Sequence, residues 1–67
     1  SSGAVEAAGL TAREREVLSL LAKGYSIVDI AQMLDLSYNT VKAQARSIYQ
    51  KLGVHKRKEL IDIVNGG

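Results

Sequence analysis

Two basic residues one helical turn apart, Lys42 and Arg46, are the side chains in this sequence best suited to bind a ligand. Residues four positions apart project from the same side of a helix. An arginine can donate two hydrogen bonds to the O6 and N7 edge of guanine, and a lysine can donate one. Asn39 can pair with adenine, while Ala43 leaves room for contact with a thymine methyl group. These four residues predict contacts with base edges in the major groove of double-stranded DNA.

Groups suited to phosphate lie around these four positions. The hydroxyls of Ser37 and Thr40, with the unpaired amides at a helix start, form a site that favours anions. The phosphate contacts expected from the residues themselves are Ser37, Tyr38, Thr40, Lys51 and Lys56. The alternative is that the basic members are solubilising surface charges, and this alternative is strongest for Lys56–Lys58, because cations at a helix start oppose its dipole.

The charges of the chain are strongly partitioned along the sequence. The net charge is only +2, but residues 37–58 carry six basic residues and no acid. All seven acidic residues lie outside that stretch. Such a block is typical of a surface that binds a polyanion, although it is also compatible with a solvated basic face.

The elements that must position these residues are helices. Thr11 and Glu14 form a capping-box pattern ahead of an apolar stripe that ends before Gly24. Ser26 begins a second helix, whose apolar residues through Leu34 recur at helical spacing. No segment alternates with the period of two that a strand needs.

A third helix is predicted over residues 38–52, capped by Ser37 and ended by Gly53. Its apolar residues Val41, Ala45, Ile48 and Leu52 share one side, and Gln50 joins the polar residues on the opposite side. A fourth helix begins near His55 or Lys56. The sequence therefore predicts an all-α four-helix bundle in which the second and third helices, joined by a three-residue turn, form a helix-turn-helix.

Length and composition exclude several other classes of protein. Sixty-seven residues suffice for one domain, placed at residues 10–65, and residues 1–9 are expected to be a flexible linker. Without cysteine and with one histidine, neither a metal site nor a cofactor is expected, and no small-molecule site is predicted. No apolar run could span a bilayer, so we expect a cytoplasmic domain, which a missing N-terminal part of a longer protein could tether to a membrane.

Other side chains have simpler interpretations than binding or catalysis. Tyr25, Tyr38 and Tyr49 could stack on single-stranded bases, but they do not share a side, so Tyr49 is assigned to the core and Tyr25 to a lid over the second helix. His55 is expected in a loop or cap. Ser37 and Thr40 lack the base that a nucleophile requires, so no catalysis is expected.

Seven segments of the chain form a familiar pattern: Leu10–Leu18, Gly24–Ser26, Asp29–Ala31, Leu34, Ser37, Thr40–Lys42 and Ile48–Val54. With these segments, the sequence from Leu10 to about Val64 resembles the DNA-binding domain of LuxR-type transcriptional regulators, which include the NarL/FixJ response regulators. The resemblance implies a four-helix domain that binds promoter DNA, usually as a dimer on two half-sites.

The resemblance also implies roles for individual residues. Lys42, Ala43 and Arg46 would face the groove, and Thr40 would approach phosphate. The last helix would supply a dimer contact through Arg57, Leu60, Ile61 and Val64. The family usually has histidine where this chain has Gln44, so the resemblance implies that Gln44 contacts the phosphate backbone in an altered way. Ala45 is small for its position in the family.

Three alternative functions stay open at this point. Region 4 of a sigma factor shares much of the pattern of the second and third helices, but it usually ends with the third. A protein-interaction module could dimerise through the last helix and bind an acidic partner through the basic one. RNA polymerase is a further possible partner of the full-length protein. An enzyme fits least, because paired acids and a cleft-sized chain are absent.

Overall fold

A computed structural model describes residues 3–66 of the chain. These residues form five helices and no strand: α1 (Gly3–Ala7), α2 (Ala12–Ala22), α3 (Ile27–Leu34), α4 (Tyr38–Leu52) and α5 (Arg57–Val64). The all-α prediction is confirmed, and α2 to α5 are the four helices expected. No helix in the described part of the chain is long and apolar enough to cross a membrane.

The helix ends follow the capping residues seen in the sequence. The hydroxyl of Thr11 accepts a hydrogen bond from the Glu14 amide, and the Glu14 carboxylate accepts one from the Thr11 amide. The hydroxyls of Ser26 and Ser37 cap α3 and α4 by accepting hydrogen bonds from the amides of Asp29 and Thr40, without the reciprocal bond seen at Thr11. At the other end of α4, Gly53 takes the left-handed conformation with φ of 69°, which a residue without Cβ adopts at no steric cost.

α3 ends at Leu34, and Asp35 directly after it is also left-handed, with φ of 55°. Aspartate tolerates this region better than most residues that carry a Cβ. Residues 35–37 thus form the short turn between α3 and α4, and the expected helix-turn-helix is present.

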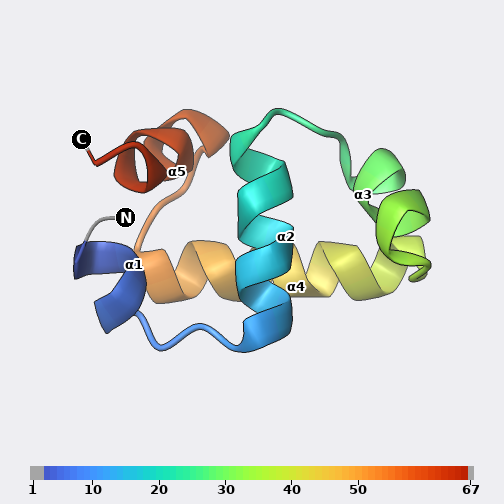
Figure 1. Ribbon diagram of the computed structural model, residues 1–67, viewed down its shortest axis with the longest axis horizontal. Coiled ribbons are helices and arrows are strands. Elements are labelled where there is room, and N and C mark those ends of the chain that lie inside the picture. The colour runs from blue at the N-terminus through green and yellow to red at the C-terminus, as the bar shows by residue number, and fades with distance from the viewer. Residues whose placement is uncertain (1–2, 67) are drawn as a thin grey trace.

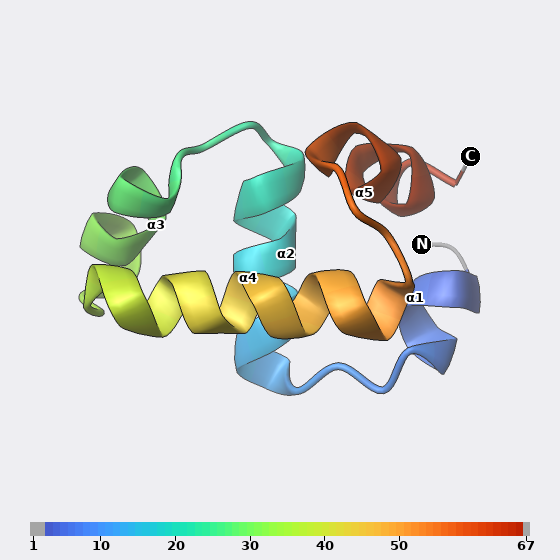
Figure 2. The same cartoon turned by 180° about the vertical axis from the view of Figure 1, so that it is seen from behind.

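The helices pack around α2, which crosses α4 (Figure 1). α3 packs against the N-terminal half of α4. α5 packs against α2 on the opposite side, above the C-terminal half of α4 in this view. The core consists of apolar side chains from every helix from α2 to α5 and from the joints: Leu10, Val17, Leu18, Leu21, Ile30, Ala31, Val41, Ala45, Ile48, Val54 and Leu60. Seen from behind, α4 lies in front of the other helices along its length (Figure 2). Its outer side is therefore uncovered.

The N-terminal segment differs from the linker expected over residues 1–9. Residues 1 and 2 lie outside the described part, but residues 3–7 form α1, which contacts α5. Val5 and Ala8 are half-buried against the core. Three of the five residues of α1 are alanine or valine, so the segment has both helical propensity and some apolar surface to bury.

Candidate nucleic-acid interface

The four residues expected to contact bases form one exposed surface of α4. Asn39, Lys42, Ala43 and Arg46 are all exposed, and we call these four residues the groove face. Within residues 3–66, neither cation of the groove face forms an ion pair or a side-chain hydrogen bond. Both are thus available to a ligand, and α4 itself contributes no acidic residue that would repel a polyanion.

Lys42 and Arg46 also border a shallow hollow of about 360 Å³ beside the groove face. Arg57 of α5 and Tyr49 of α4 line the same hollow, together with apolar residues. The fold therefore brings the guanidinium group of Arg57 near the two cations of α4, although Arg57 lies eleven positions after Arg46 in the sequence. The concentration of positive charge at this surface is larger than α4 alone provides.

The residues expected to contact phosphate fall into two groups. Ser37, Tyr38 and Thr40 are exposed at the start of α4, and Lys56 is exposed just before α5. The Ser37 hydroxyl donates to Thr40 Oγ1 at 2.8 Å while it accepts the Thr40 amide at 3.1 Å. The capping role of Ser37 is thus confirmed, and the Tyr38 side chain is 48% exposed beside it.

Gln44 is half-buried, and Lys51, although exposed, is engaged within the chain. The Oε1 atom of Gln44 is buried without a hydrogen-bond partner in the described residues. Lys51 Nζ donates to Glu14 Oε1 at 2.8 Å, so its charge is already compensated within the chain. Neither arrangement favours a strong phosphate contact.

Glu14 makes more contacts than the helix cap predicted from the sequence. Its Oε1 accepts from the Thr11 amide at 2.9 Å and from Lys51, and its Oε2 accepts from the Ser47 hydroxyl at 2.6 Å. The lysine, the serine and the amide all stabilise the charged form, so they lower the pKa of Glu14 from 4.5 to about 2. A signal was present in the sequence, because Glu14 lies on the stripe formed by Val17, Leu18 and Leu21.

The expected dimer contacts on α5 have unequal exposure. Leu60 is completely buried and packs in the core of its own chain, so its side chain is not available to a partner. Ile61 and Val64 are half-buried. Arg57 Nη1 donates to the carbonyls of Leu21 at 3.0 Å and Tyr25 at 2.6 Å, which ties α5 to the end of α2.

The described residues contain no group of three His, Asp or Glu side chains arranged to hold a metal ion. Tyr49 is half-buried against the core, as expected, whereas Tyr25 is 38% exposed. His55 lies in the joint between α4 and α5, where its amide donates to Glu59 Oε1.

Comparison with known proteins agrees with this architecture. Residues 8–64 match the family described as bacterial regulatory proteins, luxR family. The chain is 46% identical over 57 residues to the HTH-type transcriptional regulator MalT of Vibrio campbellii and 48% identical over 52 residues to that of Yersinia pestis. These alignments cover 85% and 78% of this chain but only 6% of each relative.

No solved structure is significantly similar to the chain. The family match, however, covers α2 to α5 completely, including the helix-turn-helix and the groove face. The chain therefore belongs to the luxR family of DNA-binding bacterial transcription regulators.

Proposed function

We propose that this domain binds double-stranded DNA sequence-specifically, with α4 in the major groove, as the output domain of a cytoplasmic transcription regulator. The observation that carries the proposal is the groove face: two cations one turn apart, with no partner within residues 3–66, on the exposed side of a helix that has no acidic residue. The width of the major groove admits a helix of this kind.

Within this proposal, the groove face reads base edges. Arg46 is the best candidate for guanine and Asn39 for adenine, while Ala43 allows the helix backbone to approach closely. The start of α4 contacts phosphate through the exposed Tyr38 and the Ser37–Thr40 hydroxyl pair, and Lys56 contacts it from the joint before α5.

Two copies would bind half-sites about 34 Å apart, one turn of the duplex. The half-buried Ile61 and Val64 are the residues of α5 best placed to contact a second copy, because Leu60 is fully enclosed. The relatives are named transcriptional regulators, which supports a role in transcription for this domain.

The test is selection of duplexes from a random pool, followed by measurement of affinity against salt concentration by fluorescence anisotropy. We expect an enriched sequence and a logarithm of the binding constant that falls steeply and linearly with the logarithm of salt, with a slope of about −0.9 per phosphate neutralised. Equal affinity for the selected and scrambled duplexes would leave only non-specific binding. Absence of salt-sensitive binding to any duplex would overturn the proposal.

A further inference from the structure

One buried carboxylate joins three segments of the chain. Glu14 belongs to the first turn of α2, is 7% exposed, and accepts hydrogen bonds from Thr11, Ser47 and Lys51. We call Glu14, Ser47 and Lys51 the α2 anchor. Both oxygens of the carboxylate are therefore occupied, and two of its three partners come from α4.

The α2 anchor holds α4 on a different side from the one that carries the cations of the groove face. At about 100° per residue, the Ser47–Lys51 pair lies about 140° around the helix axis from the Lys42–Arg46 pair. Glu14 is thus attached to α4 well away from both cations. Its loss cannot remove a contact that Lys42 or Arg46 makes with DNA, except by moving α4.

The geometry of the α2 anchor is suited to fixing the rotation of α4. Ser47 and Lys51 are one turn apart on α4, and each donates to a different oxygen of the same carboxylate, at 2.6 and 2.8 Å. A helix held at two points along one line resists rotation about its own axis more than a helix held by apolar contacts alone, because hydrogen bonds are directional. The capping box in turn fixes the carboxylate to the start of α2.

We propose that Glu14 is a positioning residue for DNA binding: through Ser47 and Lys51 it sets the orientation of α4, and so determines affinity without touching DNA. This inference rests on the proposed function. It also assigns Lys51 to the contact with Glu14, in place of the phosphate contact expected from the sequence.

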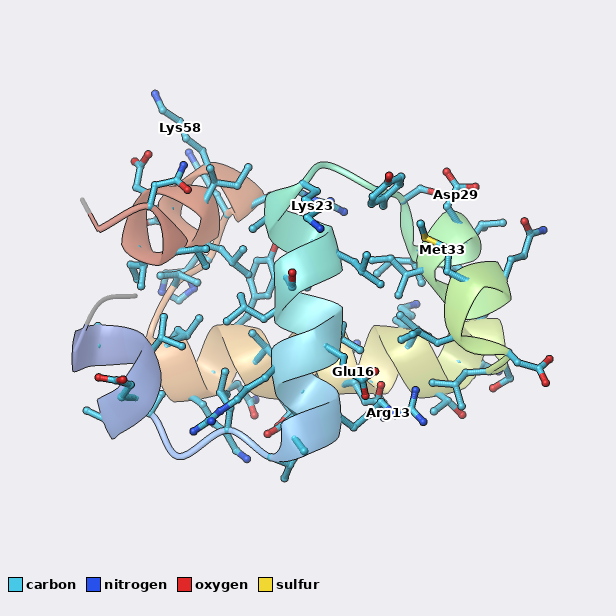
Figure 3. All side chains as sticks on the ribbon, viewed as in Figure 1. Arg13, Glu16, Lys23, Asp29, Met33 and Lys58 are labelled. Carbon is cyan, nitrogen blue, oxygen red and sulfur yellow. The ribbon has the colours of Figure 1, made fainter. Side chains whose placement is uncertain are left out.

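The decisive comparison is between Glu14→Gln and Glu16→Gln. Glu16 lies two residues further along α2, on the outside beside Arg13, with which it forms a surface pair at 3.7 Å (Figure 3). Both substitutions remove one negative charge, so general electrostatics predicts slightly tighter DNA binding for both. If Glu14 positions α4, Glu14→Gln alone should bind DNA more weakly than the wild type.

We expect Glu14→Gln to bind the selected duplex about 3- to 30-fold more weakly, the range typical of residues that modulate binding without contacting the ligand. Its salt slope should equal that of the wild type, since no phosphate contact is lost. Glu16→Gln should bind at least as tightly as the wild type. Folded fractions are measured by far-UV circular dichroism under the binding conditions and used to correct the affinities, which separates positioning from loss of fold.

Lys51 provides a second test that does not require Glu14→Gln to fold. Lys51→Met keeps the apolar stem and removes the charge, while Lys51→Arg keeps a donor for Glu14. We expect Lys51→Met to weaken DNA binding with an unchanged salt slope. Lys51→Arg should keep an affinity close to that of the wild type. A phosphate-contacting lysine would instead lower the magnitude of the slope by about 1 on removal.

The inference is overturned if Glu14→Gln, corrected for folded fraction, binds as tightly as Glu16→Gln, or if Lys51→Met lowers the magnitude of the salt slope. Failure of the proposed function looks different, because the wild-type domain itself would then show no sequence preference or no salt-sensitive binding to duplex DNA.

Discussion

The basic residues between positions 37 and 58 behave differently in two regions of the molecule. On the outer side of α4, Lys42 and Arg46 have no intramolecular partner among the described residues. Along the boundary where α4 and α5 meet α2, Lys51 binds the Glu14 carboxylate and Arg57 binds two backbone carbonyls. Positive charges close together in the sequence therefore have different roles, because Lys51 and Arg57 are hydrogen-bonded within the chain and the two cations of the groove face are not.

This difference teaches that a count of cations overstates the charge available to DNA. A solvated lysine can release counterions from phosphate, whereas a lysine already paired with a carboxylate contributes less new charge. The outer side of α4 is suited to recognition, and the boundary with α2 is suited to stability. The following predictions test that division.

The largest effect is expected from the double variant Lys42→Ala/Arg46→Ala. Each good base contact contributes about 1–3 kcal/mol to discrimination, so the variant should lose its preference between selected and scrambled duplexes. Its thermal stability should stay close to that of the wild type, because both side chains are exposed. Anisotropy titrations with both duplexes measure this, with Lys23→Ala, directly after α2, as the control. Retained preference would contradict the assignment of the groove face.

Truncation of Leu60 tests the opposite region. Leu60→Ala leaves a cavity at a fully buried site and should lower the free energy of unfolding by about 2–5 kcal/mol, measured by urea denaturation. Ile61→Ala, at a half-buried neighbour, should cost less and should weaken binding to paired half-sites more than to a single half-site. Equal losses of stability in the two variants would contradict the burial described for α5.

Arg57→Met should lower the free energy of unfolding by about 1–3 kcal/mol, because two carbonyls at the end of α2 lose a charged donor. Lys58→Met is the matched control, since the Lys58 side chain points away from the fold (Figure 3). It should change stability by no more than about 0.5 kcal/mol. If the two variants were equally stable, Arg57 would be a surface charge like its neighbour.

The smallest expected effect is a difference in how steeply the free energy of unfolding falls with decreasing pH. The pKa of Glu14 is lowered from 4.5 to about 2, so its contribution to stability is present above pH 4.5 and is lost as the pH falls towards 2. Hydrogen bonds from the His55 and Lys56 amides also lower the pKa of Glu59, which adds to the loss below pH 4.5.

Glu14→Gln should therefore lose less unfolding free energy than the wild type between pH 4.5 and pH 2, as measured by urea denaturation at several pH values. Glu16→Gln should follow the wild-type curve. Identical curves for the wild type and Glu14→Gln would show that the α2 anchor does not contribute to acid sensitivity.

Much of the fold was determined by the sequence alone, because its signals are local. Capping by Thr11, Ser26 and Ser37 depends on residues three positions apart, and the end of α4 depends on the conformational freedom of Gly53. The exposure of Lys42 and Arg46 followed from the apolar stripe on the opposite side of α4, since helical spacing fixes which residues share a side.

Only the tertiary structure decided what the remaining charges contact. Glu14 and Ser47 are 33 positions apart, and Arg57 and Leu21 are 36 apart, so no local pattern could pair them. Glu14 and Arg57 each share a helix side with apolar residues, and this spacing does not identify the partner of either charge. Partners for buried charges depend on how whole helices cross, and the crossing of α2 with α4 and α5 is set by packing of the complete core.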